Sequence, residues 1–354
     1  MRLAFDWPAS SFTGWGVYGL NLALELAKAG IEVTSTQVGR ADQLALDPMR
    51  TNALMPFLRR SNMQQPVPED AILLHALGNE FLPQLDPAQA EKDCVGIIFF
   101  EEPLSRIAME RAKRYPVIIA GSTWNAEVLR SHGLADVRFL IQGVDRSLFH
   151  PAPRRDLYPG RFLIFSGGKV EPRKGQDIVV KAFRIFAQRH PEAMLVTAWD
   201  SPWPHLARGM DVDYSDFRDR VIAIKATPNG AMAPIYRECH VGLFPNRCEG
   251  GTNLVAMELI ACGIPAIISA NTGHLDLMQR TFARPVDCDP ATNESDLDQI
   301  LHELERVFSG HIGSSAYNGL SGWDQTASGL IEAASSLSSQ RSTYERPSST
   351  HAAA

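Results

Sequence analysis

Residues 244–269 read FPNRCEGGTNLVAMELIACGIPAIIS, and this stretch decides the fold that the sequence predicts. A strand ends at Phe244-Pro245, a glycine-rich loop follows, a helix begins near Asn253, and residues 264–269 form the next strand. Asparagine and threonine are suitable N-caps for such a helix. Because the unpaired N–H groups of a helix N-terminus attract anions, the stretch predicts a β–α–β unit with an anion site at the strand end.

Short apolar runs alternate with amphipathic helical stretches on both sides of this unit, as is typical of parallel sheets covered by helices. Residues 150–160 hold three prolines, two arginines and a glycine, which indicates a linker. We therefore predict an α/β protein with two Rossmann-like, doubly wound domains facing a central cleft, over residues 1–150 and 151–310. Residues 335–354 are rich in Ser, Thr and Ala without apolar periodicity, and we expect a disordered tail there.

Composition narrows the class of protein. The 354 residues are too many for one ordinary core, and a net charge of −6 argues against a general nucleic-acid binder. Five cysteines without a CxxC pair indicate reduced thiols in a cytoplasmic protein, not a disulfide framework or a zinc site. The N-terminal apolar run is too short for a signal peptide, and no run of 18 apolar residues could span a membrane. Peripheral contact with the inner face of a membrane stays open.

A second glycine-rich stretch, FSGGKVEPRKGQD over residues 165–177, follows a strand and opens a helix. Gly167 and Gly168 would let the backbone approach a ligand, and Lys169 and Lys174 would bring cations to the strand end where open α/β sheets bind ligands. Two such lysines suit a diphosphate, although surface lysines at a turn fit the pattern equally well. Arg173, between them, is expected to face solvent.

A third stretch, FTGWGVYG over residues 12–19, spells the G-x-G-x-x-G dinucleotide pattern. NAD is disfavoured, because residues 6–13 separate the strand from the glycines and the second strand ends at Thr36-Gln37 without an acidic residue for a ribose. Two interpretations remain. The loop at Gly14 and Gly16 offers N–H groups to a phosphate held by the opposite domain, or it is a flexible turn.

Together these stretches resemble the family 4 retaining glycosyltransferases of the GT-B fold, from the Gly14 loop to about Ala334. In that family a basic residue, a spacer and a Lys-Gly pair bind the donor diphosphate, and Lys169 and Lys174-Gly175 look like them. Two glutamates around a glycine-rich loop, followed by a small-Cys-Gly-x-Pro run, look like Glu249, Glu258 and residues 261–265. Smaller likenesses lie at residues 122–129, 141–149 and 323–327. The last implies a C-terminal helix, over residues 311–334, that crosses back to the first domain.

The resemblance implies a site for a nucleotide-sugar donor. Its residues would be Gly14, Gly16, Gly168, Lys169, Lys174, Glu249, Gly250, Gly251, Thr252, Asn253, Leu254 and Glu258. Glu258 would hold the ribose and Glu249 would lie near the sugar, although the two are nine positions apart where the family has eight. Where many members carry a histidine near the sugar, this chain has Glu101 within Phe100-Glu-Glu-Pro103. His75, at the end of another strand, is the alternative.

The implied reaction is glycosyl transfer with retention, in which Lys169, Lys174 and the helix N-terminus at Asn253 stabilise the departing diphosphate. Glu249 and Glu101 would act on the sugar side. No protein nucleophile is evident, so the acceptor would attack on the leaving-group face. Asp211-Val-Asp213 lies in a polar loop without the context of a metal site, and we expect no metal and no cofactor beyond the nucleotide sugar.

Three other functions compete with this one: a nucleotide-sugar epimerase of the same fold, a non-catalytic nucleotide-sugar-binding protein, and an NAD-dependent dehydrogenase resting on Gly14–Gly19 alone. The acceptor leaves no recognisable pattern in residues 39–68. An envelope polysaccharide or another glycoconjugate is the general expectation, with UDP or GDP as the nucleotide by family analogy.

Overall fold

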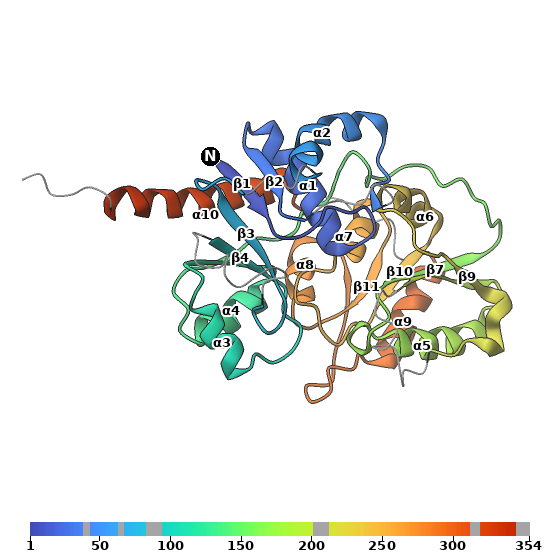
Figure 1. Cartoon of the computed structure of the whole chain (residues 1–354). Helices are drawn as coiled ribbons and strands as arrows, with labels where there is room; N and C mark the ends of the chain where they lie inside the picture. Colours follow the sequence, from blue (N-terminus) through green and yellow to red (C-terminus); the bar gives the residue numbers. More distant parts are fainter. Residues whose placement is uncertain (38–42, 63–66, 83–93, 201–211, 312–318, 345–354) are drawn as a thin grey trace, which may run out of the picture.

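The computed structural model describes residues 1–37, 43–62, 67–82, 94–200, 212–311 and 319–344 of the chain, with one parallel sheet in each half of the molecule (Figure 1). Each sheet has helices on both faces, and four separate clusters of buried apolar side chains correspond to these four faces. The predicted pair of doubly wound α/β domains is therefore confirmed.

Six parallel strands form the first sheet. In chain order they are β1 (Arg2–Phe5), β2 (Glu32–Ser35), β3 (Ile72–Leu77), β4 (Cys94–Ile98), β5 (Val117–Ala120) and β6 (Val137–Phe139). Their order in the sheet is β2-β1-β3-β4-β5-β6, so the winding reverses between β1 and β3. The helices of this part are α1 (Gly14–Lys28), α2 (Pro48–Asn62), α3 (Arg106–Ala112) and α4 (Thr123–Ser131). The first two pack on one face of the sheet and the last two on the other.

The second sheet also has six parallel strands. They are β7 (Phe162–Gly168), β8 (Ala193–Trp199), β9 (Val221–Ala223), β10 (Val241–Phe244), β11 (Ala266–Ser269) and β12 (Arg284–Val286). The order β12-β11-β10-β7-β8-β9 reverses between β7 and β10, and a ligand of such a sheet binds at that reversal, beyond the carboxyl ends of the strands. The edge strand β12 has three residues and contains a proline, so no apolar run marks it in the sequence.

In the described part of the second domain, five helices and three short 3₁₀ turns accompany the sheet. They are η3 (Pro172–Lys174), α5 (Gln176–Arg189), η5 (Ser215–Arg220), η6 (Asn229–Ala231), α6 (Met232–Glu238), α7 (Leu254–Ala261), α8 (His274–Arg280) and α9 (Leu297–Phe308). Helices α5 and α9 cover one face, and α6, α7 and α8 cover the other. Helix α7 begins after Asn253, as the sequence predicts, because the Asn253 side chain caps it by accepting a hydrogen bond from the Ala256 amide at 3.3 Å.

The last helix, α10 (Trp323–Tyr344), returns to the first sheet and packs beside α1 (Figure 1). The chain passes between the two domains before β7 and again before α10. These two passages lie side by side, because the Val144 amide donates a hydrogen bond to the Ser321 carbonyl at 2.9 Å. The prediction of disorder from residue 335 is wrong as far as Tyr344, and residues 345–354 lie outside the described part. Buried Leu330, Ala333 and Leu337 share one side of α10, and this apolar stripe holds the helix on the first core.

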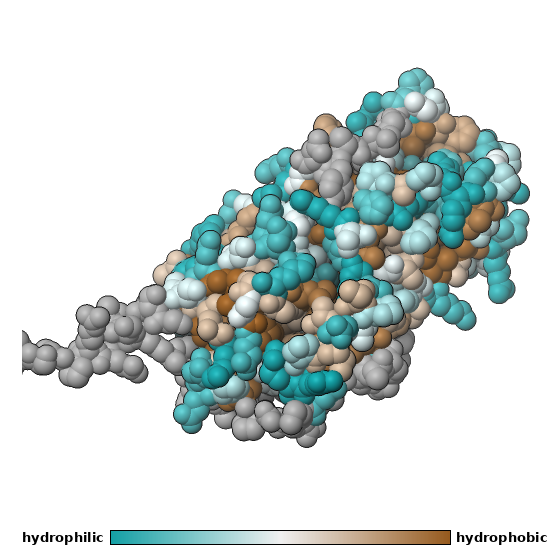
Figure 2. Space-filling model, turned by 90° about the horizontal axis from the view of Figure 1, so that it is seen from above, coloured by the Kyte–Doolittle hydropathy of each residue, from teal (hydrophilic) through white to brown (hydrophobic). Residues whose placement is uncertain are grey.

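On the surface, hydrophilic residues spread over both halves of the molecule with hydrophobic residues among them (Figure 2). Met49, Ile107 and Phe282 are large apolar side chains that lie more than half exposed on different elements. Among the helices that the structure describes, none combines the length and the apolar content that crossing a membrane requires.

Candidate functional site

The two sheets meet through the loops at the carboxyl ends of their strands. Ser122, after β5, donates a hydrogen bond to the Gly250 carbonyl at 2.7 Å, and the Thr123 amide donates to Asp276 at 2.6 Å. The Asn229 amide, after β9, donates to the Ser11 carbonyl at 2.7 Å. These contacts join the ligand-binding edge of the second sheet to the first domain.

The turn between β7 and α5 brings the predicted lysines to this edge. Gly175 has φ +67°, and a Cβ atom there would lie 2.2 Å from the Pro245 carbonyl oxygen, so only glycine fits. This close approach seats the turn against the end of β10. The Lys174 side chain is 12% exposed, whereas the Lys169 side chain is 41% exposed and lies 3.7 Å from Glu171.

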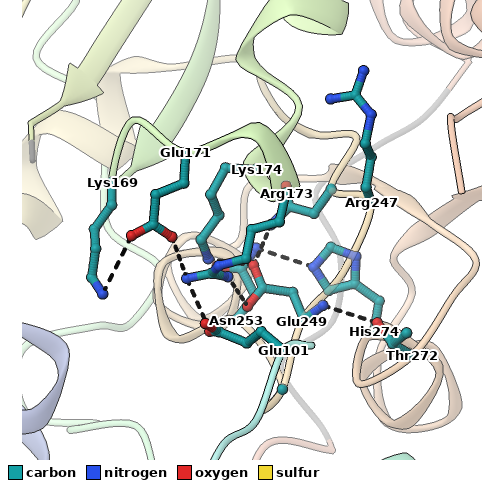
Figure 3. A network of polar contacts seen from close by, with 12 residues as sticks. Glu101, Lys169, Glu171, Arg173, Lys174, Arg247, Glu249, Asn253, Thr272 and His274 are labelled. Carbon is teal, nitrogen blue, oxygen red and sulfur yellow. Dashed lines mark hydrogen bonds and ion pairs between the residues drawn. The ribbon is translucent and has the colours of Figure 1, made fainter. Parts of the chain in front are cut away.

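Glu249 lies beside Lys174, and the two side chains form an ion pair (Figure 3). The Asn246 side chain donates a hydrogen bond to the same carboxylate. Burial alone would raise the pKa of Glu249, but the charges of Lys174 and Arg173 outweigh it and lower this pKa to about 2. The Glu249 carboxylate is therefore ionised throughout the neutral range. Burial also lowers the pKa of Lys174, with Glu249 opposing that shift.

Arg173 does not face solvent, so that expectation is wrong. Its Nη2 atom lies 2.7 Å from Glu171 and 2.9 Å from Glu101, and its Nη1 atom lies 3.6 Å from Glu249. Arg247, in contrast, points away from this cluster (Figure 3) toward Asp177 and Glu294. Arg173 lies within η3, whereas Arg247 lies on the loop after β10.

Glu101 is the first domain's contribution to the cluster. It follows β4, and its amide donates to the Asn79 side chain at 3.0 Å. Burial raises the pKa of Glu101, and the nearby Arg173 opposes this shift. The structure thus brings together four of the predicted residues, Glu101, Lys169, Lys174 and Glu249, and adds Arg173 and Glu171, which the sequence analysis did not select.

The N-terminus of α7 is held by a buried histidine. Asn253 Nδ2 lies 3.1 Å from His274 Nε2, and His274 Nδ1 lies 2.8 Å from Ser269 Oγ. Burial lowers the pKa of His274 to about 4, so the ring is neutral at neutral pH. Thr252 turns its hydroxyl toward Met257 Sδ at 2.9 Å, and Leu254 packs against the core of the first domain.

Glu258, one turn further along α7, lies outside the ionic cluster. Asn229 Nδ2 donates to one carboxyl oxygen at 2.6 Å, and the Tyr236 hydroxyl donates to the other at 3.1 Å. Burial raises the pKa of Glu258 to about 8, with these two hydrogen bonds opposing the shift. Asn229 also contacts Ser11 through its backbone, so this hydrogen-bonded pair lies next to the loop before Gly14.

The glycines of the loop after β10 pack against the first domain. A Cβ atom on Gly250 would lie 2.5 Å from the carbonyl oxygens of Phe99 and Phe100, and one on Gly251 would lie 3.1 Å from the Phe99 ring. Gly250 therefore needs glycine for interdomain contact, whereas a side chain at Gly251 would require the Phe99 ring to shift by a few tenths of an ångström. Gly168, with φ +128°, lies against the Lys174 stem.

The stretch around Gly14 is helical, so the expected glycine loop is wrong. Helix α1 begins at Gly14, and Thr13 caps it by accepting a hydrogen bond from the Gly16 amide at 3.2 Å. A Cβ atom on Gly16 would lie 2.3 Å from Ser10 Cβ. Gly16 therefore serves packing and its N–H group is already bonded, whereas Gly14 is exposed at the first position of the helix.

His75 lies within β3 and not beyond its end. Its ring is buried, with Nδ1 3.4 Å from Asp6 Oδ2 and the ring 5.8 Å from that of Tyr115. Burial lowers the pKa of His75 to about 4. These contacts belong to the interior of the first domain, and Glu101 is the residue that reaches the ionic cluster.

Within the described ranges, no three side chains of the His, Cys, Asp and Glu types gather in a way that could hold a metal ion. Asp211 of the Asp-Val-Asp stretch lies outside those ranges, and Asp213 accepts a hydrogen bond from the Ser215 amide at 2.9 Å. Metal independence stays a prediction.

The second domain is similar to a known protein family. Residues 160–301 match the family model described as glycosyl transferases group 1. The D-inositol 3-phosphate glycosyltransferase of Segniliparus rotundus is 25% identical over 247 residues, which are 65% of this chain and 55% of that protein. A GDP-mannose-dependent alpha-(1-6)-phosphatidylinositol dimannoside mannosyltransferase of Mycobacterium tuberculosis is 23% identical over 211 residues, 56% of this chain and 50% of that protein. The chain thus spans about half the length of the curated relatives it matches.

Solved structures resemble the whole chain. A sucrose-phosphate synthase from Thermosynechococcus elongatus superposes with a TM-score of 0.66 at 15% identity, covering 96% of this chain and 100% of that one. Anabaena HepE in complex with UDP-glucose gives a TM-score of 0.64 at 15% identity, with 96% and 100% covered. The chain therefore has the GT-B fold, and its second domain carries the sequence pattern of the glycosyl transferases group 1.

Proposed function

We propose that this protein is a retaining glycosyltransferase of family 4 that moves a sugar from a nucleoside-diphosphate sugar to an acceptor. The observation that carries the proposal is the meeting of Lys174, the N-terminus of α7 and two carboxylates from different domains at the winding reversal of the second sheet. The match of residues 160–301 to a glycosyltransferase family and the similarity to a structure holding UDP-glucose support it.

The diphosphate would bind to Lys169, Lys174 and the first amides of α7. Negative charge grows on this group as the glycosidic bond breaks, and fixed positive charges stabilise it. Lys174 is paired with Glu249 in the structure, so a phosphate oxygen has to compete with that carboxylate. The exchange would free Glu249 to accept hydrogen bonds from sugar hydroxyls, a task for which carboxylates are suited.

The sugar would lie between Glu249 and Glu101. Among the described residues of the cluster, both carboxylates already interact with Arg173, and neither is placed as a free nucleophile. We therefore infer that the acceptor attacks on the face from which the diphosphate leaves, which retains the anomeric configuration. Glu258 would serve the ribose through its hydrogen-bonded pair with Asn229.

The two domains would bind different substrates. Residues 1–150 would receive the acceptor, residues 151–310 the donor, and the C-terminal helix would tie the two together. An envelope polysaccharide or another glycoconjugate is the proposed class of acceptor, and the protein would act in the cytoplasm or at the inner face of the membrane, without a metal.

Thermal unfolding with UDP, GDP, ADP, TDP and NAD, in the presence of a chelator, tests the donor site. A nucleotide at 100 times its dissociation constant should stabilise the folded chain by about 2.7 kcal/mol. We expect one nucleoside diphosphate to raise the melting temperature of the wild type and of Lys181→Ala, an exposed lysine on α5, but not of Lys174→Ala. A response to NAD alone, or to none of the five, would refute the proposal.

A further inference from the structure

Arg173 is the point at which the charges of the two domains meet. It belongs to the second domain, and of its three carboxylate partners Glu171 and Glu249 belong to the same domain while Glu101 comes from the first (Figure 3). The Arg173 and Glu101 side chains are 16% and 27% exposed, so water screens their attraction only in part. This ion pair exists only while the two domains lie together.

Glu101 and Glu249 would repel each other without this guanidinium. Glu249 is buried and Glu101 is partly exposed, and the charge of Glu249 raises the pKa of Glu101. The charged groups that face Glu101 are Arg173, Lys174, Glu249 and Lys169. The two lysines are the groups best placed to serve a diphosphate, which leaves Arg173 as the cation available to keep both carboxylates charged.

Resting on the proposed function, we infer that Arg173 is a positioning residue for the donor sugar. It holds Glu101 and Glu249, one from each domain, where both accept hydrogen bonds from the same sugar ring. Recognition of the sugar ring would then need groups from both domains, whereas the second domain alone would recognise the nucleotide.

The planar guanidinium suits this role better than an ammonium group. Its separate N–H groups can face different carboxylates at fixed angles, which a single Nζ atom cannot do. In the structure Nη2 serves Glu101 and Glu171, while Nη1 is turned toward Glu249 and makes no hydrogen bond with the described residues. Lysine at this position should therefore keep the charge but lose part of the geometry.

Titration calorimetry can separate the sugar from the nucleotide without an acceptor. The full-length protein would be titrated with UDP, GDP, UDP-glucose and GDP-mannose, and the affinity gained from the sugar is the ratio of the two dissociation constants for one base. Arg173→Gln, Arg173→Lys, Glu101→Gln and the double variant of Arg173→Gln with Glu101→Gln would be compared with wild type. Arg184→Gln is the matched control, since this arginine of α5 pairs with the exposed Asp216.

We expect Arg173→Gln and Glu101→Gln each to reduce the sugar's share of affinity about tenfold, the worth of 1.4 kcal/mol, and to leave the nucleotide within about twofold. The double variant should be no worse than either single one, and Arg173→Lys should recover part of the loss. Because Arg173 lowers the pKa of Glu101, Arg173→Gln should also lose sugar affinity on acidification at a higher pH than wild type does.

Equal weakening of nucleotide and nucleotide sugar, additive losses in the double variant, or an unchanged pH dependence in Arg173→Gln would each overturn the inference. If the wild type binds a nucleoside diphosphate and the variants gain as much affinity from the sugar as the wild type does, this inference alone is refuted. A wild type that binds none of the four ligands refutes the proposed function, and this inference with it.

Discussion

Two glutamates in one short stretch of the second domain, Glu249 and Glu258, differ in their charge state. Both are almost fully buried, at 4% and 3% exposure. Lys174 and Arg173 lower the pKa of the first to about 2, against the effect of burial, whereas burial raises the pKa of the second to about 8. At neutral pH the first is a carboxylate and the second is largely a neutral acid.

The difference comes from the partners. Glu249 lies on the loop that faces the cationic turn, and it has two positively charged neighbours. Glu258 lies inside α7, and its donors among the described residues are the neutral side chains of Asn229 and Tyr236. Burial alone does not decide whether a carboxyl group is charged, and a charge that is paired inside the protein becomes expensive to leave unpaired.

The largest effect is expected for Glu249→Gln. Glutamine keeps the shape but leaves Lys174 buried beside a neutral group, and removing one partner of a buried ion pair costs about 3 kcal/mol or more. Urea unfolding at neutral pH would measure the loss of unfolding free energy. Glu294→Gln is the control, because Glu294 is half-exposed beside Arg247 and its replacement should cost less than about 1 kcal/mol. Equal losses in the two variants would contradict the paired state of Glu249.

The second effect is a pH dependence that Glu258 gives to stability. Its pKa is raised from 4.5 to about 8 on folding, so between these values the folded state keeps a proton that the unfolded state has lost. Stability from this group is therefore present below pH 4.5 and falls as the pH rises toward 8, by at most about 1.4 kcal/mol per pH unit.

Glu258→Gln cannot titrate and should lack this fall. The unfolding free energies of wild type and Glu258→Gln, compared from about pH 5 to about pH 8, should therefore differ by an amount that changes steadily with pH. Glu249 has the opposite sign, since its lowered pKa places its contribution above pH 4.5 and removes it as the pH falls toward 2. A constant difference between wild type and Glu258→Gln over that range would show that Glu258 is ionised.

The surroundings of Glu249 could be predicted from the sequence better than those of Glu258. The Lys174-Gly175 pair, the loop at Gly250 and the cap at Asn253 are local patterns, and each lies where the strand-loop-helix alternation predicts. Arg173 was missed because Glu101 comes from the other domain and Glu249 from another loop, and no local spacing encodes the approach of these two carboxylates. The partners of Glu258 lie on η6 and α6, and they were missed for the same reason.

Elsewhere two missed features did have a local signal. Thr13 directly before the glycines of α1 is a good N-cap, and this indicates a helix beginning at Gly14 instead of a loop. Leu330, Ala333 and Leu337 recur at helical spacing, which indicates that α10 continues beyond residue 334 despite its serines.

The smallest effect is expected for Tyr236→Phe, which tests directly whether Glu258 is neutral while Glu249 is charged. The Tyr236 hydroxyl donates to Glu258 at 3.1 Å, and a hydrogen bond between neutral groups contributes about 1 kcal/mol, whereas one to a charged group contributes about 1.5–3 kcal/mol. We expect the smaller loss near pH 6, measured by urea unfolding, with the half-exposed Tyr158→Phe as the control that should change little. Removing this donor also raises the pKa of Glu258 further, because the Tyr236 hydrogen bond lowers it. The loss should therefore grow as the pH is raised past the wild-type pKa of about 8, where ionised Glu258 depends most on its donors. A loss of about 1.5–3 kcal/mol already near pH 6 would mean that Glu258 is a carboxylate, as Glu249 is. The different partners of the two glutamates would then make no difference to their charge.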